Sequence, residues 1–138
     1  MVKKNILTVL FLCTIVLFYS CDAFKTTTSP EETLKERINL LMTSKLNGDW
    51  ATVYDLYNTN FKNKISKKSF NRSKNMTFIS YRIESLEMDT SKKMADAVVK
   101  SEIETGGYTL KDVPENQHWI IENGEWFLAV KPVTGFID

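Results

Sequence analysis

Residues 118–129 read HWIIENGEWFLA, and this stretch decides the fold. At its centre, Asn123-Gly124 favours a two-residue β-hairpin turn, because both residue types tolerate a positive φ. The two strands then pair outward from Glu122 opposite Glu125, and paired side chains point to the same side of a sheet. One face of the hairpin is wholly apolar and is expected to face the core. It consists of Trp119, Ile121, Trp126, Leu128 and Val130.

The opposite face of this hairpin is mixed and is expected to point outward. It carries His118, the only histidine of the chain, which the pairing places opposite Ala129. We therefore expect His118 to be a surface residue away from any pocket. A register shift of one residue would exchange the two faces and bring His118 inside.

Apolar and polar residues also alternate with a period of two in the sequence before this hairpin, and this pattern predicts three more strands, the last of which is the first strand of the hairpin. They cover residues 78–88, 94–104 and 108–122, with a turn at Gly106-Gly107 and an interruption of the third strand at Pro114. A change of phase at Ser85-Leu86 indicates a β-bulge. No acidic residue is expected on the core face of any strand. The core face of the second strand is expected to comprise Ala95, Ala97, Val99, Ser101 and Ile103.

The chain before these strands has helical periodicity. Ser29-Pro30 is typical of a helix start, and apolar residues recur with a period near 3.6 up to residue 46. A second helix is expected over residues 50–57, ended by Asn58-Thr59-Asn60, and a third, short helix over 66–73. The order predicts an α+β fold in which two to three N-terminal helices pack on a curved four-stranded antiparallel sheet.

Composition limits the classes of function. The chain has 138 residues, a formal net charge of +1 and ordinary globular proportions of apolar and charged residues. This length favours a single domain. The near-neutral charge argues against nucleic acid as a partner, because such domains are usually clearly basic.

The N-terminus has the layout of a secretory signal. Lys3 and Lys4 precede an apolar run over residues 6–19, and Cys21 follows. This segment resembles a bacterial lipoprotein signal peptide, which implies cleavage before Cys21, lipidation of Cys21 and attachment outside the cytoplasm to the cell membrane or the outer membrane. The resemblance divides the chain into a signal peptide (1–20), a lipidated Cys21 with its tether (21–28) and a domain (29–138). The alternatives are ordinary cleavage, for instance after Ala23, or an uncleaved anchor.

Several segments of the domain together resemble the nuclear transport factor 2-like superfamily. They are residues 48–57, Phe61, residues 65–70, residues 95–99 and residues 119–128. The resemblance implies a cone-shaped α+β fold. Its members include isomerases, dehydratases and polyketide cyclases as well as proteins without catalysis, so the fold leaves the activity open.

The residues favour binding over catalysis. No catalytic constellation, metal site or cofactor is expected, because the domain has one histidine and no cysteine after Cys21. We expect a non-catalytic module that binds a small apolar ligand or another envelope protein. The alternative is a small isomerase or dehydratase that uses a tyrosine and a carboxylate. Aromatic side chains are the candidates for lining a pocket: Trp50, Tyr54, Tyr57, Tyr81, Trp119 and Trp126.

Two surfaces are candidates for interactions. Residues 62–82 carry basic side chains and no acidic one, so a basic face could meet anionic lipid headgroups or an acidic partner. Val98, Ile120 and Phe127 are apolar residues expected on the outer sheet face, where they suggest a homodimer. The basic face comprises Lys62, Lys64, Lys67, Lys68, Arg72 and Lys74, with Arg82 nearby.

Overall fold

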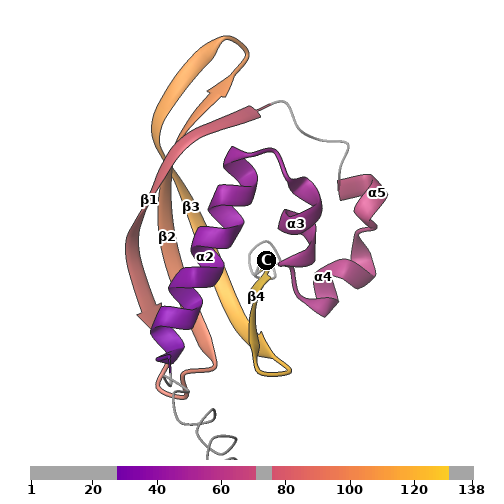
Figure 1. Cartoon of the computed structure of the whole chain (residues 1–138), viewed down its shortest axis with the longest axis vertical. Helices are drawn as coiled ribbons and strands as arrows, with labels where there is room; N and C mark the ends of the chain where they lie inside the picture. Colours follow the sequence, from indigo (N-terminus) through magenta and orange to yellow (C-terminus); the bar gives the residue numbers. More distant parts are fainter. Residues whose placement is uncertain (1–27, 71–75, 131–138) are drawn as a thin grey trace, which may run out of the picture.

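The computed structural model describes residues 28–70 and 76–130, which form an α+β domain as predicted (Figure 1). Four antiparallel strands form one sheet in the order β1-β2-β3-β4. The helices precede the strands in the chain. In order, the elements are α2 (Pro30–Leu46), α3 (Trp50–Asp55), α4 (Thr59–Lys64), α5 (Lys67–Phe70), β1 (Met76–Met88), β2 (Met94–Thr105), β3 (Tyr108–Glu122) and β4 (Glu125–Ala129).

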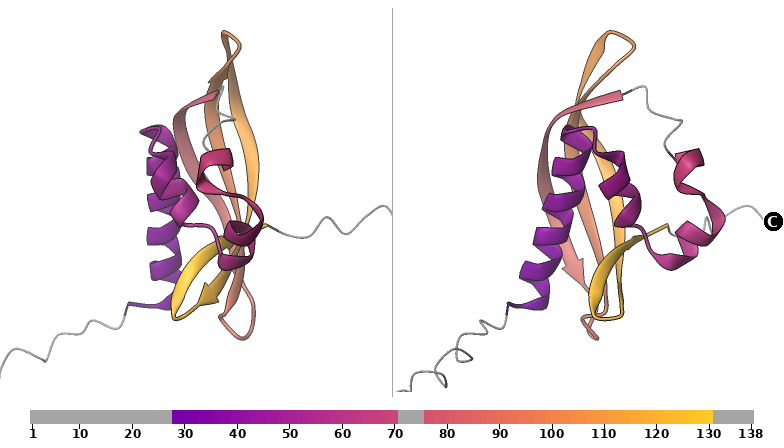
Figure 2. Two further views of the ribbon diagram at one scale, coloured as in Figure 1. Left: turned by 90° about the vertical axis from the view of Figure 1, so that its right-hand side faces the viewer. Right: turned by 45° about the vertical axis from the view of Figure 1, so that its right-hand side comes forward.

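The helices form a layer on the concave side of the curved sheet (Figure 2). Helix α2 crosses this side, α3 follows beside it, and α4 and α5 lie on the side of α3 away from α2 (Figure 1). Ser29 caps α2 by accepting a hydrogen bond from the backbone N–H of Glu32 at 3.2 Å. The predicted start of this helix is therefore confirmed.

The predicted register of the last hairpin is also confirmed. Strands β3 and β4 pair from Glu122 opposite Glu125 to His118 opposite Ala129. Both turn residues have the positive φ that a tight hairpin requires, at 52° for Asn123 and 85° for Gly124. The bulge predicted in β1 is present as a register shift between Ile83 and Ser85.

The prediction that Pro114 interrupts the third strand is wrong. Strand β3 is continuous, and Pro114 pairs in register with Lys100 of β2. The pairing of β4 with β3 extends only as far as His118, so within the described part of the chain Pro114 has a neighbouring strand on one side only. Proline is tolerated at such an edge because no second ladder of hydrogen bonds needs its missing N–H.

Two helix predictions need correction. The second helix ends at Asp55, and a further helix, α4, begins at the segment expected to break it. Asn58 starts this helix, because its Oδ1 accepts a hydrogen bond from the N–H of Phe61 at 3.0 Å. Asparagine caps helices as readily as it breaks them. The third predicted helix is the short α5, and residues 71–73 of that prediction lie outside the described residues.

The core lies between α2, α3 and the concave face of the sheet. The predicted inward face of β2 is buried along its whole length, as are Trp119, Trp126 and Leu128. Ile121 packs against this core while partly buried. Val130, also predicted to be inside, is 57% exposed because β4 ends one residue before it.

Candidate functional site: a cavity beside the end of β4

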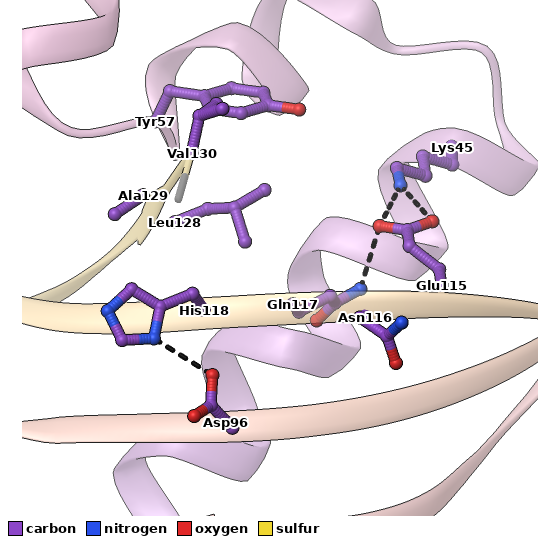
Figure 3. A pocket seen from close by; sticks show the side chains of 10 residues that line it. All are labelled: Lys45, Tyr57, Asp96, Glu115, Asn116, Gln117, His118, Leu128, Ala129 and Val130. Carbon is purple, nitrogen blue, oxygen red and sulfur yellow. Dashed lines mark hydrogen bonds and ion pairs between the residues drawn. The ribbon is translucent and has the colours of Figure 1, made fainter. Parts of the chain in front are cut away.

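A cavity of about 460 Å³ opens where β4 ends and β3 continues (Figure 3). Among the described residues, no strand pairs with β3 on the β4 side beyond His118, and residues from both faces of β3 line the cavity. Helix α2 and the segment after α3 complete the wall. The lining residues are Lys45, Tyr57, Asp96, Glu115, Asn116, Gln117, His118, Leu128, Ala129 and Val130.

Backbone hydrogen bonds between the segment after α3 and β4 build the apolar wall. The N–H of Leu128 donates to the carbonyl of Leu56 at 2.9 Å, and the N–H of Asn58 donates to the carbonyl of Leu128 at 2.9 Å. These bonds hold Tyr57 above the end of β4. The ring of Tyr57 stacks on Phe61 with centroids 4.0 Å apart. The wall is therefore positioned by the backbone and supported by aromatic packing.

The polar end of the cavity is centred on Glu115. The Lys45 ammonium, at the last turn of α2, lies 2.6 Å from both carboxylate oxygens. Gln117 Nε2 donates to Glu115 Oε1 at 3.0 Å, and Trp119 Nε1 donates to Gln117 Oε1 at 3.1 Å. A chain of hydrogen bonds thus runs from the buried Trp119 to the Lys45–Glu115 ion pair.

Glu115 contradicts the prediction that no acidic residue lies on a core face. It pairs with the buried Val99 of β2, and on β3 it shares the inward side of Gln117 and Trp119. The alternation of side chains along a strand, followed back from Trp119 by two and four residues, places Gln117 and Glu115 on the inward face. The carboxylate is tolerated there because Lys45 compensates its charge and its side chain stays 30% exposed.

Tyr57 faces Glu115 across the cavity, and its hydroxyl is neutral. Burial and the negative charge of Glu115 raise the pKa of Tyr57 to about 12, because both disfavour the tyrosinate. Within residues 28–70 and 76–130, this hydroxyl has no hydrogen-bond partner. It is therefore available to donate to, or accept from, a bound molecule.

His118 lies on the outer sheet face, as the register predicted, and its Nδ1 is 2.9 Å from Asp96 Oδ1. It is nevertheless not remote from a pocket, which corrects the sequence-based expectation. Outward side chains of β3 reach the rim of the cavity beside the end of β4, and His118 is one of them. Among the described residues, the lining contains the carboxylates of Glu115 and Asp96 and the ammonium of Lys45.

Of the six aromatic pocket candidates, Tyr57 lines this cavity. Two others have hydroxyls bound elsewhere in the domain, Tyr54 to the carbonyl of Ile65 at 2.8 Å and Tyr81 to Asn39 Oδ1 at 3.1 Å. Trp119 is fully buried beneath the cavity. Trp50 packs its ring edge against Phe78, and Trp126 lines a second cavity of about 370 Å³ and donates its indole N–H to the carbonyl of Pro30.

The basic face is partly neutralised by Asp55 where the structure describes it. Lys67 pairs with the Asp55 carboxylate at 2.9 Å, and Lys62 donates to the Asp55 carbonyl at 2.7 Å. Lys64 and Lys68 are exposed on α4 and α5. Arg72 and Lys74 lie outside the described residues. Contact of this face with lipid or an acidic partner stays a prediction.

The three residues of the predicted dimer surface are each half-buried. The Phe127 ring lies 5.5 Å from the Arg37 guanidinium and 5.3 Å from the Lys62 ammonium, which come from α2 and α4. Phe127 therefore packs against helical side chains, unlike Val98 in the middle of the sheet. Dimer formation stays a prediction.

Two other kinds of site are absent from the described part of the chain. No helix within residues 28–70 and 76–130 is long and apolar enough to cross a membrane. The same residues contain no cluster of three or more His, Cys, Asp or Glu side chains that could hold a metal ion.

Comparison with known proteins identifies the fold and no family. No family model matches the chain, and no curated protein matches it. Among solved structures, the solution structure of a SEC-C motif-containing protein from Rhodopseudomonas palustris is similar, with a TM-score of 0.55 and 11% sequence identity. The match covers 77% of this chain and 79% of the other. At this identity the similarity concerns the fold alone, so the chain belongs to an α+β architecture shared with that protein.

Proposed function

We propose that this protein is a lipid-anchored bacterial protein outside the cytoplasm, and that it binds a small, mainly apolar ligand without transforming it. The observation that carries the binding proposal is the cavity beside the end of β4. Its volume, about 460 Å³, falls within the range of roughly 300–1,000 Å³ typical of ligand sites. An apolar wall with a few convergent polar groups is also the usual composition of such sites.

The hydrogen bonds of Glu115 favour binding over proton transfer. A general base needs a lone pair directed at the substrate. Here Lys45 binds both carboxylate oxygens, and Gln117 binds one of them a second time. The carboxylate is therefore engaged by the protein, which disfavours a role in removing a proton from a ligand.

The alternative function is a small isomerase or dehydratase. The observation that favours it is the presence of a carboxylate and a neutral tyrosine hydroxyl, Glu115 and Tyr57, on one cavity. These are the residue types that the resemblance to the nuclear transport factor 2-like superfamily associates with catalysis. Conversion of a bound compound, abolished in Glu115→Gln, would establish this alternative.

Support for the lipid anchor comes from the layout of residues 1–21, which lie outside the described residues. The first described helix, α2, begins at Pro30, so only a short stretch of sequence separates it from Cys21. A diacylated cysteine together with further acylation anchors a protein stably, whereas a single acyl chain binds membranes only marginally.

Intact mass of the protein purified from bacterial membranes tests the anchor. We expect a mass that starts at Cys21 and includes an acylated glyceryl group, and we expect Cys21→Ala to lack that group. A mass that starts at Met1, or one that starts after Ala23 without lipid, would contradict the anchor.

Binding of N-phenyl-1-naphthylamine, a neutral apolar fluorophore, tests the cavity. We expect residues 22–138, which contain all the described contacts, to bind one equivalent with increased emission. Val130→Trp should fill the apolar side of the cavity and weaken binding at least about tenfold, a change of about 1.4 kcal/mol. Val98→Trp, which adds the same bulk on the outer sheet face, should leave the affinity unchanged. Equal binding by the two variants, or none by the parent chain, would argue against the proposal.

A further inference from the structure

The charged groups at the polar end of the cavity are paired with each other. The Lys45 ammonium lies 2.6 Å from both oxygens of Glu115, and the lysine side chain is only 8% exposed. A cationic ligand at Glu115 would meet this ammonium, and an anionic ligand could reach Lys45 only by displacing the carboxylate. Either ion would lose hydration without gaining an unpaired counter-ion from this pair. The pair therefore favours an uncharged ligand.

Glu115 nevertheless keeps the capacity to accept one more hydrogen bond. A carboxylate offers about four lone-pair sites on its two oxygens. Oε1 accepts from both Lys45 and Gln117, whereas Oε2 accepts only from Lys45 among the described residues. The side chain lines the cavity and is 30% exposed, so a donor inside the cavity can reach Oε2.

Tyr57 supplies a second hydrogen-bonding group. In Figure 3 its hydroxyl points toward the side of the cavity that holds Glu115 and Lys45. Among the described residues this hydroxyl has no hydrogen-bond partner. Burial and the negative charge of Glu115 raise the pKa of Tyr57 to about 12, so the hydroxyl keeps a proton to donate. One donor and one acceptor are thus directed into the same cavity.

From this arrangement we propose that the ligand is an uncharged alcohol with an apolar body. Its hydroxyl donates a hydrogen bond to Glu115 Oε2 and accepts one from the Tyr57 hydroxyl. Its apolar part lies against Leu128 and Val130. One alcohol group satisfies both partners, because a hydroxyl has one donor and two acceptor lone pairs. This inference rests on the proposed function, because it names the class of ligand for the same cavity.

The two hydrogen bonds distinguish an alcohol from other uncharged compounds. An ether or a ketone accepts from the Tyr57 hydroxyl but has no proton to donate to Glu115. Its oxygen lone pairs would then face the carboxylate, which is unfavourable. The alcohol keeps its proton in this contact, so the arrangement is one for binding.

Four probes that carry different groups on one phenylbutyl skeleton separate the classes: 4-phenylbutan-1-ol, 1-methoxy-4-phenylbutane, 4-phenylbutylamine and 5-phenylpentanoate. Each is titrated at the same pH into isotopically labelled residues 22–138, and the indole N–H resonances are followed. The Trp119 indole reports on Glu115 through Gln117, whereas the Trp126 indole donates to the carbonyl of Pro30. Trp50→Phe and Trp126→Phe assign the three signals.

We expect the alcohol to shift the Trp119 signal and to bind at least about tenfold more tightly than the ether, the amine or the carboxylate. Tyr57→Phe keeps the ring that stacks on Phe61 and removes only the hydroxyl. It should weaken alcohol binding about fivefold. Tyr81→Phe is the matched control and should leave the affinity unchanged, because its hydroxyl binds Asn39 at 3.1 Å.

A double variant tests the contact with the carboxylate. Lys45→Met combined with Glu115→Gln removes both charges of the pair together, so neither is left buried alone. A hydrogen bond to a neutral amide is weaker than one to a carboxylate. We therefore expect the preference for the alcohol over the ether to fall at least about threefold. An unchanged preference would overturn the contact with Glu115.

The outcomes distinguish this inference from the proposed function. Binding of the ether, the amine or the carboxylate as tightly as the alcohol would overturn the alcohol class and leave the binding cavity in place. Alcohol binding that is unchanged in Tyr57→Phe would overturn the assigned position of the ligand hydroxyl. Binding of N-phenyl-1-naphthylamine without binding of the alcohol would overturn this inference alone, and binding of neither would count against both proposals.

Discussion

Trp119→Ala is expected to lower the free energy of unfolding by about 4 kcal/mol, the middle of the range for truncating a buried aromatic residue. Trp119 is completely buried in the cluster between the sheet and α2. Its removal leaves a large void, and the side-chain oxygen Oε1 of Gln117 loses the indole N–H that donates to it at 3.1 Å. Urea denaturation of the parent chain and the variant, followed by far-ultraviolet circular dichroism, measures the loss.

Ile120→Ala is the control for this prediction. Ile120 is the next residue of β3, and it points to the opposite face of the sheet, where it is half-buried. We expect less than half the loss seen for Trp119→Ala, because less apolar surface is removed from contact. Equal losses for the two variants would mean that the inward and outward faces of β3 have been assigned incorrectly.

Glu115→Ala is expected to lower the free energy of unfolding by about 3 kcal/mol. The substitution leaves the nearly buried ammonium of Lys45 without its counter-ion. The amide of Gln117 loses an acceptor in the same step. Removing one member of a buried ion pair is expensive, whereas replacing both members by apolar side chains is often neutral. Lys45→Met combined with Glu115→Leu should therefore recover most of the stability lost in Glu115→Ala.

Glu84→Ala provides the comparison for this second prediction. Glu84 and Lys100 form an ion pair at 2.6 Å, with side chains 41% and 28% exposed. Exposed ion pairs contribute little to stability, so we expect Glu84→Ala to lower the free energy of unfolding by less than about 1 kcal/mol. Similar losses of unfolding free energy for Glu84→Ala and Glu115→Ala would contradict this prediction. They would show that water reaches the Lys45 ammonium easily once Glu115 is removed.

Local patterns in the sequence were sufficient for the parts of the fold that neighbouring residues decide. Asn123-Gly124 determined the register of β3 and β4, because a two-residue turn leaves only one pairing for the residues on either side. Alternation in β2 identified its buried face because side chains of a strand point to opposite sides in turn. Ser29 similarly marked the start of α2 through a contact three residues away.

The same local rules failed where the outcome depended on the end of an element. The pattern predicts a helix break at Asn58, yet Asn58 caps α4. Val130 continues the alternation of β4 and is therefore predicted to lie in the core, but the strand ends before it. Both errors concern where a helix or strand begins or ends. Such boundaries depend on tertiary contacts as much as on the propensities of neighbouring residues.

The sequence by itself therefore determined the α+β class and the inward faces of the last hairpin and of β2, because turns and alternation act over a few residues. Only the tertiary structure decided the cavity and its polar end. Backbone hydrogen bonds of Leu128 with Leu56 and with Asn58 hold Tyr57 against β4, at the point where the described pairing of β4 with β3 ends. The Lys45–Glu115 pair joins residues 70 positions apart. Such a pair forms only when helix and sheet are packed together, so no periodicity within either segment could reveal it.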